Sequence, residues 1–382
     1  MIIEDNLGHI FSPTLCVTHR CNLNCVYCYQ NNKEFKTMDF STGTRCIDDI
    51  FSMIPQDVKM VEISFIGGEP LLEFELIKKL YEYTFDKYKG DRVHFFATTN
   101  GTVLNEESKR WFTEHRKKFV LGLSLDGQKE THNQNRSNSF DDIDIPFFLE
   151  NWPKQGVKMT LSEKSLDTLA QDIQFIHSLG FKSINGVNFA EGDFDWDNKI
   201  TLKKLSVQLN ELLNYYSNNY NLVLDQMFGK HIEYCSASNK RKYRSCGIGT
   251  RTILYDTDGA KYPCSFVTPL TFSPKELKEI LLTNFNNNNT FVDRSCEGCY
   301  ILPVCGTCSG ANYLLNGTFS KRNKTRCNLN KIIVLYIAEY HARKILFNRD
   351  DYKDSNQLFY LIEAIKSIRN EYLPIFRDIL AI

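Results

Sequence analysis

The amino-acid sequence predicts an α/β fold, in which a partial (β/α)6 barrel is followed by a small loop-rich domain and by C-terminal helices. Between residues 12 and 190, short strand-like runs alternate with helical stretches, which is typical of parallel sheets. Regular periodicity is lost over 231–330 and returns as helical periodicity from Leu329. We therefore expect a barrel domain over 12–218, a loop-rich domain over 231–330 and a helical segment over 331–382.

Six runs in the first half of the chain are rich in Val, Ile and Phe and are bounded by Gly, Asn, Asp or Pro, as β-strands usually are. They are Pro13–Val17, Met60–Ile66, Arg92–Thr98, Phe119–Leu125, Val157–Leu161 and Ser183–Phe189. Because crossovers between parallel strands are right-handed, six such units predict an open, partial barrel rather than a closed barrel of eight. In folds of this kind the chemistry lies at the carboxyl ends of the strands.

The helical stretches between the strands carry start and stop signals. Ser41 is an N-cap signal for a helix over Thr42–Ile54, and Leu72–Tyr88 has apolar residues at helical spacing. A third helix, over Ser165–Leu179, is expected to stop at Gly180, because glycine commonly follows the last turn of a helix.

Composition and charge exclude several classes of protein. The chain has 382 residues, of which 42% are hydrophobic, and this is enough for a large core and excludes disorder. Its 46 Lys and Arg residues balance 46 Asp and Glu residues, which argues against a nucleic-acid partner. The N-terminus lacks the features of a secretory signal, and no apolar run is long enough to span a membrane. We therefore expect a cytoplasmic protein without a membrane partner.

The 13 cysteines are the unusual feature of this composition, and they fall in two groups separated by a long stretch without cysteine. A disulfide framework fits poorly, because disulfide-rich chains are short and secreted and because the count is odd. Grouped thiols in a reducing compartment usually bind metal. We expect metal ligands in both groups, whereas Cys16 on the first strand and Cys46 on the first helix are predicted to be core residues.

Cys21, Cys25 and Cys28 follow directly after the first predicted strand. Three thiolates on one loop can bind a cubane iron–sulfur cluster and leave its fourth iron without a protein ligand. Such an iron can chelate adjacent amine and carboxylate groups, such as the methionine end of S-adenosylmethionine (SAM). An electron delivered through it would cleave the sulfonium and create a carbon radical. A zinc loop with a remote fourth ligand is the alternative.

Polar and glycine-rich segments follow the next three strands. Gly67–Pro70, with the sequence Gly-Gly-Glu-Pro, follows the second strand, Thr98–Gly101 ends the third and Ser124–Gly127 ends the fourth. The glycine pair lets the backbone approach a ligand closely, and a carboxylate or carbonyl there can accept a hydrogen bond from an ammonium group. Arg136, in the loop after the fourth strand, can bind a carboxylate through two parallel hydrogen bonds.

With these motifs, the stretch from about residue 12 to 190 resembles the radical SAM enzymes. The resemblance rests on Cys21–Tyr29, on the Gly-Gly-Glu-Pro segment and on the stretch from Ser124 to Arg136. It implies that Cys21, Cys25 and Cys28 ligate a SAM-cleaving [4Fe–4S] cluster, with Tyr27 as the aromatic residue before the last ligand. It also implies that Gly67, Gly68 and Glu69 contact the methionine amino group of SAM and that Ser124 and Arg136 contact its carboxylate. Ribose and adenine would be contacted by Thr160, Ser162 and Val187–Phe189. Asn100 completes the expected cofactor-binding set.

No side chain stands out in the sequence as the catalytic base. Tyrosines and aspartates are plentiful in the expected barrel mouth, and none is singled out by its spacing. His19 and His132 flank the motifs, but a structural hydrogen bond explains each of them at least as well as catalysis does.

The C-terminal group contains Cys235 and seven further cysteines: Cys246, Cys264, Cys296, Cys299, Cys305, Cys308 and Cys327. Two close Cys-x-x-Cys pairs can form one zinc site, but that site leaves Cys246, Cys264 and Cys327 unexplained. The spacing around Gly259 makes this stretch similar to the SPASM domain, the twin auxiliary-cluster module of peptide-modifying radical SAM enzymes. One departure is the two residues between Cys305 and Cys308, where the family commonly has three.

This second resemblance implies two auxiliary [4Fe–4S] clusters besides the SAM-binding one. The first would be bound by Cys246, Cys264 and Cys308, and the second by Cys296, Cys299, Cys305 and Cys327. Cys235 is the candidate for the missing fourth ligand of the first auxiliary cluster. If Cys235 does not bind, that cluster has an open iron that the substrate can coordinate.

The two resemblances together imply a maturase of a ribosomally made precursor peptide. A 5′-deoxyadenosyl radical would abstract a hydrogen, and an oxidised crosslink, a thioether or a carbon–carbon bond, would form while the auxiliary clusters relay the electron. The expected partners are the precursor peptide and an electron donor such as flavodoxin or ferredoxin. Because the first strand begins by about residue 13, we expect the peptide to be bound by a separate leader-binding protein, by the barrel mouth or by the C-terminal helices.

Three other functions are open at this point. An anaerobic sulfatase maturase, which makes formylglycine, is expected to carry Asp directly after the cysteine that matches Cys264, where this chain has Ser265. A non-catalytic electron-transfer or zinc-binding protein would also use grouped cysteines, and iron quantitation distinguishes the zinc case. The balanced charge counts against an RNA-modifying enzyme.

Overall fold

The computed structural model describes residues 10–90, 92–191, 194–237, 246–347 and 354–381. The N-terminal stretch used above to exclude a secretory signal, residues 1–9, lies outside the described residues. The chain divides into two compact units. The first unit contains the chain up to Ser124 together with His132–Pro153 and Gly247–Asn287, and the second contains Leu125–Thr131, Lys154–Cys246 and Asn288–Ile382. The segment 231–330 is thus shared between both units.

The first unit is built on one sheet with the strand order β4-β3-β2-β1-β7-β8. Its strands are β1 (Ile10–Thr18), β2 (Met60–Gly67), β3 (Val93–Thr99), β4 (Phe119–Leu123), β7 (Thr252–Tyr255) and β8 (Lys261–Tyr262). All neighbouring strands are parallel except β8, which runs antiparallel to β7. The first four predicted strands are therefore confirmed. Within the segment expected to be loop-rich, the pair β7–β8 is regular structure, and β7 extends the sheet beside β1.

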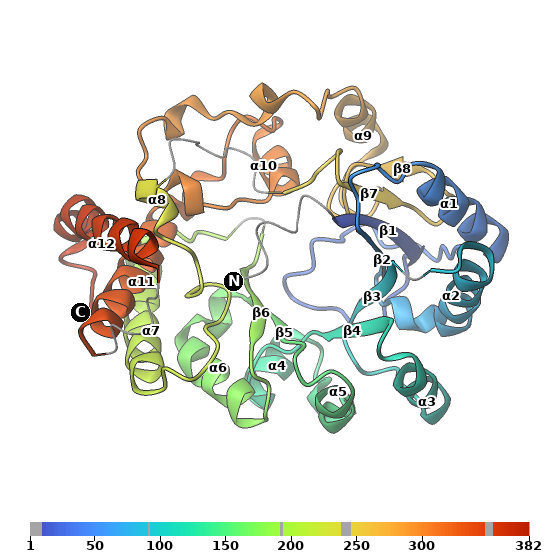
Figure 1. Ribbon diagram of the computed structural model, residues 1–382, viewed down its shortest axis with the longest axis horizontal. Coiled ribbons are helices and arrows are strands. Elements are labelled where there is room, and N and C mark those ends of the chain that lie inside the picture. Colours follow the sequence, from blue (N-terminus) through green and yellow to red (C-terminus); the bar gives the residue numbers. More distant parts are fainter. Residues whose placement is uncertain (1–9, 91, 192–193, 238–245, 348–353, 382) are drawn as a thin grey trace. The chain divides into compact units, whose positions relative to one another are not determined.

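The helices of the first unit follow its strands in the sequence, and Figure 1 shows α1, α2 and α3 on the same side of the strands they connect. They are α1 (Phe40–Ser52), α2 (Phe74–Tyr88), α3 (Glu106–His115), α5 (Ile145–Asn151) and α9 (Pro274–Leu281), while α4 (Lys129–Asn135) crosses the boundary between the units. The N-cap of α1 is Asp39 rather than the predicted Ser41. The Asp39 carboxylate accepts hydrogen bonds from Thr42 N (2.7 Å) and from Ser41 Oγ (2.9 Å), so the helix begins earlier than predicted.

Aromatic side chains form the core between this sheet and its helices. The rings of Phe65, Phe95 and Phe119, one from each of three neighbouring strands, stack with centroids 5.8 to 5.9 Å apart. Tyr81 of α2 and Trp111 of α3 pack against this stack. Burial of each such ring stabilises the fold by about 1.5–3 kcal/mol, so this cluster fixes the sheet from which the loops at its carboxyl edge extend.

The second unit contains the remaining two predicted strands, β5 (Val157–Leu161) and β6 (Ile184–Phe189), paired in parallel. Its helices are α6 (Leu169–Ser178), α7 (Lys199–Asn218), α8 (Tyr234–Ala237), α10 (Ser309–Asn316), α11 (Cys327–Phe347) and α12 (Ser355–Phe376). Short 3-10 turns connect them: η4 (Glu163–Thr168), η5 (Asn288–Phe291), η6 (Arg294–Cys296), η7 (Leu302–Val304) and η8 (Lys324–Arg326).

Helix packing organises the second unit. Helix α11 packs against both α7 and α12, and the hydroxyls of Ser206 on α7 and Tyr336 on α11 lie 2.7 Å apart in a buried hydrogen bond. Gly180 follows α6 with a φ of 110°, which confirms the predicted stop signal. The predicted α/β class with parallel strands is confirmed. Among the described residues, no helix combines the length and apolar character that crossing a membrane requires.

Candidate active site

The loop after β1 carries Cys21, Cys25 and Cys28 at the carboxyl edge of the first sheet. All three thiols are partly buried. Burial raises the pKa of the Cys21 thiol, the charge of Lys33 lowers it, and the charges of Glu69 and Cys28 raise it further. The amide of Cys28 donates to the carbonyl of Cys25 (3.1 Å), which turns the chain and draws these two cysteines together. The loop thus carries three partly buried thiols, which are soft ligands for iron.

The cysteine loop is held by the segment that follows α4. Val26 N donates to Asn135 O (3.0 Å), and Asn24 N donates to Ser137 Oγ (2.9 Å). Ser137 adopts a left-handed conformation with a φ of 56°, which shapes this segment into a turn. The predicted neighbourhood of the cysteine motif and the stretch ending at Arg136 is therefore present within the first unit.

The glycine pair after β2 lies against the start of the cysteine loop. Gly68 N donates to Thr18 O (3.1 Å), and Glu69 N donates to Arg20 O (2.9 Å). A Cβ atom on Gly68 would lie 2.3 Å from Arg20 O and 2.7 Å from Cys21 Cβ, distances that real side chains do not reach. Glycine is required at position 68 because the backbone of the loop passes directly over it.

The Glu69 carboxylate is buried and satisfied by three donors. Its Oε1 accepts from Leu71 N (3.1 Å) and Thr99 Oγ1 (2.8 Å), and its Oε2 accepts from Asn100 N (2.8 Å). Burial raises the pKa of Glu69 to about 7, although these donors and the Arg136 charge lower it. Glu69 therefore joins the ends of β2 and β3, and any contact of this residue with an ammonium group adds to these three bonds.

Asn100, a predicted cofactor residue, connects the end of β3 to the cysteine loop. Its Nδ2 donates to Asn22 Oδ1 (2.9 Å), and its Oδ1 accepts from Thr102 N and Oγ1. Asn22 in turn donates to Thr102 Oγ1 (2.7 Å). Sequence reasoning did not single out Asn22, because a polar residue between two ligands has no signature of its own.

Arg136 and Ser124 also lie in the first unit. The Arg136 guanidinium is buried over the ring of Tyr27, with its Cζ 5.3 Å from the ring centroid, so the aromatic residue before Cys28 supports a cation. Ser124 is buried, and its amide donates to Thr99 O (2.9 Å). The structure thus gathers the three cysteines, Gly67–Glu69, Asn100, Ser124 and Arg136 in one unit.

The remaining residues expected to contact the cofactor, Thr160, Ser162 and Val187–Phe189, lie in the second unit, where Thr160 and Ser162 have local partners. Thr160 N donates to the buried carboxylate of Asp126 (3.0 Å). Ser162 forms a capping box with Ser165 at the start of η4. Asp126 belongs to the segment Ser124–Gly127 that follows the fourth strand, but its role as the anchor of β5 depends on a strand that comes later in the chain.

Four cysteines of the second unit form a set of interacting thiols. Burial raises the pKa values of Cys305 and Cys327, and the charges of Cys299 and Cys296 act on Cys305 while those of Cys305 and Cys296 act on Cys327. This four-cysteine set, Cys296, Cys299, Cys305 and Cys327, matches the ligands expected for the second auxiliary cluster. Four thiolates are the usual complement of a closed [4Fe–4S] cluster, so the donor chemistry fits.

Cys235 lies with this four-cysteine set. It belongs to α8, which packs against η7 between Cys299 and Cys305 and against α12. Burial raises the pKa of the Cys235 thiol to about 12, and the charges of Cys299 and Cys305 contribute. The expectation had paired Cys235 with the first auxiliary set, and the structure places it beside the second.

The first auxiliary set is divided between the units. Cys246 Sγ lies 3.9 Å from Ser309 Oγ, next to Cys308, and all three residues belong to the second unit. Cys264 belongs to the first unit, where it follows β8. Each of these thiols is at least partly accessible.

The cysteines and histidines predicted to be structural are buried and hydrogen-bonded or packed in the core. Cys16 and Cys46 have 0% and 4% of their surface exposed. His19 is buried, and its Nε2 lies 2.7 Å from Asp256 Oδ1, while His132 Nε2 lies 3.2 Å from Ser139 Oγ. Cys16 completes a buried group with His19 and Asp256, which joins the end of β1 to the turn after β7.

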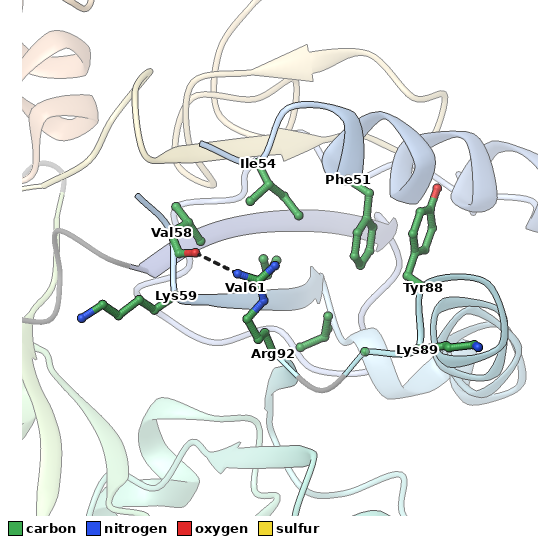
Figure 2. Close-up of a pocket in the computed structure, with 10 residues that line it drawn as sticks. Phe51, Ile54, Val58, Lys59, Val61, Tyr88, Lys89 and Arg92 are labelled. Atoms are coloured by element: carbon green, nitrogen blue, oxygen red, sulfur yellow. Dashed lines mark hydrogen bonds between the residues drawn. The ribbon is translucent and has the colours of Figure 1, made fainter. Parts of the chain in front are cut away.

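A separate cavity of about 320 Å³ lies at the opposite edge of the first sheet. Figure 2 shows it between the aromatic rings of Phe51 and Tyr88 and the first residues of β2 and β3, with Lys59 and Arg92 at its margin. The cysteine loop follows the carboxyl end of β1, whereas this cavity lies at the amino ends of β2 and β3. It is therefore not part of the candidate active site.

Comparison with known proteins identifies the class of the chain. Residues 15–144 match the Radical SAM superfamily. An uncharacterized protein of Methanocaldococcus jannaschii is 33% identical over 187 residues, which cover 47% of this chain and 62% of that relative. A cysteine-type anaerobic sulfatase-maturating enzyme of Clostridium novyi is 24% identical over 322 residues, covering 75% of this chain and 83% of the relative. The subtilosin biosynthesis protein AlbA of Bacillus subtilis is 24% identical over 68% of this chain and 56% of its own length.

Solved structures share the fold. The structure of histidine-tagged anSMEcpe with bound AdoMet has a TM-score of 0.68 at 20% identity, and the match covers 92% of this chain and 98% of that one. Streptococcus suis SuiB bound to precursor peptide SuiA has a TM-score of 0.56 at 16% identity, covering 84% and 78%. The family match covers the cysteine loop, the glycine pair, Glu69 and Arg136. The segment 15–144 of this chain is therefore similar to the Radical SAM superfamily, and the similarity to a maturating enzyme over 75% of the chain indicates an enzyme.

Proposed function

We propose that the chain is a radical SAM maturase that introduces an oxidised crosslink, a thioether or a carbon–carbon bond, into a ribosomally made precursor peptide. The observation that carries this proposal is the half-buried cysteine loop at the carboxyl end of β1, held against Gly68 and Glu69. The SAM-binding cluster, when bound there with SAM, supplies a 5′-deoxyadenosyl radical that abstracts hydrogen from the peptide.

The residues of the first unit fit this cofactor. Cys21, Cys25 and Cys28 would hold three irons of a [4Fe–4S] cluster, which leaves one iron for SAM. Gly68 brings the backbone against the loop without a Cβ, so a small ligand can lie along it. Arg136, supported by the ring of Tyr27, offers a cation for the methionine carboxylate.

The chain's own residues also support two auxiliary [4Fe–4S] clusters. The second auxiliary cluster would be held by the four-cysteine set, whose thiols already interact in the described chain. The first would be held by Cys246, Cys264 and Cys308, and without Cys235 it keeps an iron that the peptide can coordinate. The roles of these clusters are to accept and relay the electron that the substrate loses on oxidation.

A peptide is the substrate class favoured by the comparisons. SuiB is solved with the precursor peptide SuiA, and AlbA takes part in the biosynthesis of the bacteriocin subtilosin. The zero net charge of this chain provides no excess of cations for a nucleic acid. An electron donor such as flavodoxin or ferredoxin, and a separate leader-binding protein, complete the proposed set of partners.

Anaerobic reconstitution tests the proposal. The reconstituted enzyme with SAM and dithionite is expected to form 5′-deoxyadenosine. It is also expected to convert a precursor peptide encoded beside it to a product that has lost hydrogen, as read by mass spectrometry. Cys25→Ala is the control and should form neither. Equal 5′-deoxyadenosine formation by the wild type and Cys25→Ala would contradict the proposal.

A second candidate function is formylglycine formation on a sulfatase, which the 24% identity to the Clostridium novyi enzyme favours. The expected Asp after Cys264 is replaced by Ser265, whose hydroxyl cannot serve as a comparable base at neutral pH. The two functions are separated by offering a sulfatase-derived peptide containing cysteine beside the precursor peptide. Conversion of the sulfatase peptide alone would establish the second function in place of the first.

A further inference from the structure

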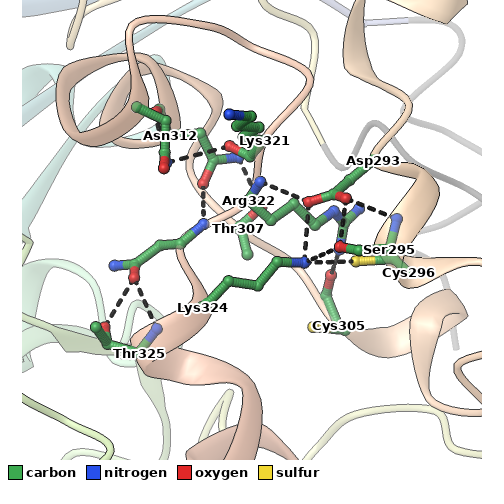
Figure 3. A network of polar contacts seen from close by, with 12 residues as sticks. Asp293, Ser295, Cys296, Cys305, Thr307, Asn312, Lys321, Arg322, Lys324 and Thr325 are labelled. Atoms are coloured by element: carbon green, nitrogen blue, oxygen red, sulfur yellow. Dashed lines mark hydrogen bonds and ion pairs between the residues drawn. The ribbon is translucent and has the colours of Figure 1, made fainter.

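Three thiols of the four-cysteine set lie beside hydrogen-bond donors from other parts of the second unit. Lys324 Nζ lies 3.4 Å from Cys296 Sγ, Asn330 Nδ2 lies 3.6 Å from Cys305 Sγ, and the Tyr372 hydroxyl lies 3.9 Å from Cys299 Sγ. Figure 3 shows the Lys324 side chain extended toward Cys296. A single such contact is common near a cysteine, but three donors around one set indicate a shared electrostatic role.

Lys324 is fixed in this position by two further acceptors. Its Nζ lies 3.0 Å from Asp293 Oδ2 and 2.6 Å from Ser295 Oγ. Asp293 is itself held, because its Oδ2 accepts from Arg322 N (2.9 Å) and its Oδ1 accepts from Ser295 N and Oγ. The ammonium group therefore loses little further freedom when it donates to sulfur.

The local sequence explains why Lys324 is placed so accurately. It opens the turn η8, which runs directly into Cys327 at the start of α11. Asn323 caps this turn through Thr325 N (3.0 Å), and its own amide donates to Asn312 Oδ1 (2.9 Å). The same short segment thus supplies a cluster ligand and the cation that faces a different ligand.

A cation and amide donors near thiolates change how readily an iron–sulfur cluster is reduced. A [4Fe–4S] cluster with four thiolates is anionic, and reduction adds one more negative charge. Positive charge and N–H groups directed at the sulfurs stabilise the reduced form more than the oxidised form, so the reduction potential rises. Half of the Lys324 side chain is exposed, so water screens part of its charge, whereas Asn330 is buried beside Cys305.

We infer that Lys324 and Asn330 raise the reduction potential of the cluster bound by Cys296, Cys299, Cys305 and Cys327, which suits this cluster to accept electrons. This inference rests on the proposed function, since it takes for granted that the four-cysteine set binds a cluster. It adds two residues that are not ligands and assigns the larger effect to Lys324, because an ammonium group carries a full charge and an amide does not.

A redox titration followed by electron paramagnetic resonance tests the inference without measuring turnover. The reconstituted wild type, Lys324→Met, Lys324→Arg and Asn330→Leu are titrated, and the signal that is lost in Cys296→Ala identifies the relevant cluster. At the potential where this cluster is half reduced in the wild type, Lys324→Met is expected to show an about tenfold lower ratio of reduced to oxidised cluster, which corresponds to about 59 mV for one electron. Lys324→Arg, which keeps the charge, is expected to shift less, and Asn330→Leu about threefold.

Lys321→Met is the matched control, because it removes an exposed cation three positions from Lys324 in the same loop. Its titration is expected to coincide with that of the wild type. If Lys324→Met retains the full iron content and also titrates with the wild type, the inference is overturned. If Lys321→Met shifts the potential as much as Lys324→Met does, the inference is also overturned, because net charge alone would then explain the shift. A wild-type protein that binds no iron would overturn the proposed function instead.

Discussion

The cysteine loop of the first unit and the four-cysteine set of the second unit differ in what surrounds their thiols. Cys21 lies near the carboxylate of Glu69, whose charge adds to burial in raising the pKa of that thiol. Cys296 instead lies against the ammonium group of Lys324, and Cys305 against the amide of Asn330. At Cys21 the charges of Lys33 and Glu69 thus oppose each other, whereas Lys324 and Asn330 direct N–H groups at sulfur in the four-cysteine set.

The two sites also differ in their number of cysteine ligands. Three thiols on one loop leave an iron open to a small molecule, whereas four thiols close a cluster and restrict it to electron transfer. Under the proposed function, the same ligand type would serve a SAM-cleaving site on the loop and an electron acceptor at the four-cysteine set. The number of cysteines and the side chains around them would both contribute to this difference.

The largest expected effect comes from removing one ligand at each site. Cys28→Ala is expected to reduce 5′-deoxyadenosine formation to background, because the cluster that meets SAM loses one of its three ligands. Cys296→Ala is expected to keep 5′-deoxyadenosine formation but to lose the peptide product. Chromatography of the nucleoside and mass spectrometry of the peptide measure both. If Cys296→Ala also abolishes 5′-deoxyadenosine formation, the two sites do not have separate roles.

The next effect concerns the backbone that supports the cysteine loop. Gly68→Ala would place a Cβ 2.3 Å from Arg20 O, so the loop must shift by the better part of an ångström. A displacement of this size at a reacting centre costs about 100-fold, so SAM cleavage is expected to fall by about that factor while the iron content stays near the wild-type value.

Gly90→Ala is the control for this variant, since its Cβ would meet only side-chain and Cβ atoms at 3.2 Å or more, far from the loop at the amino edge of the sheet. It should cleave SAM at nearly the wild-type rate. Equal rates in Gly68→Ala and the wild type would show that the close approach at position 68 does not position the cofactor.

The parallel strands could be predicted from the sequence, because each is a compact run of β-branched and aromatic residues with turn residues at both ends. The short strand β7 could not, because Thr252–Tyr255 lies among Gly, Asp and Cys residues and is stabilised by pairing with the distant β1. Asp39 rather than Ser41 caps α1, since both residue types are good caps and only the backbone geometry decides between them.

The candidate site was predictable where its residues are close in sequence and unpredictable where they meet through folding. The spacing of Cys21, Cys25 and Cys28 is a local property of one loop. Cys235 was the candidate for the missing fourth ligand of the first auxiliary cluster, but the packing of α8 against η7 brings it near Cys299. Lys324 had no signature at all, because its role depends on the position of a thiol 28 residues away.

A pH dependence follows from the buried carboxyl group beside the cysteine loop. Burial raises the pKa of Glu69 from 4.5 to about 7, so the folded protein holds this proton more tightly than the unfolded chain does. Stability is therefore expected to fall as the pH rises from about 4.5 to about 7, by on the order of 1–3 kcal/mol, and to level off above. Denaturant unfolding of the reconstituted protein at a series of pH values measures this slope.

Glu69→Gln should lose this slope, because an amide does not titrate, although its NH2 group faces one of the three donors that the carboxylate accepts. Glu75→Gln, at an exposed position on α2, should keep the wild-type slope. If the slope persists unchanged in Glu69→Gln, another titrating group causes it. Glu69 would then no longer count as the anionic neighbour of Cys21 that distinguishes the two sites.

The smallest expected effect tests how finely the four-cysteine set is tuned. The Tyr372 hydroxyl is neutral and lies 3.9 Å from Cys299 Sγ, a longer contact than those of Lys324 and Asn330 with their sulfurs. Tyr372→Phe removes only this hydroxyl and should change the ratio of reduced to oxidised cluster by less than about threefold, in the same direction as Lys324→Met. Tyr360→Phe, another tyrosine of α12, is the control. A shift in Tyr372→Phe as large as in Lys324→Met would mean that exclusion of water by α12, rather than the charge of Lys324, sets this cluster apart from the one that meets SAM.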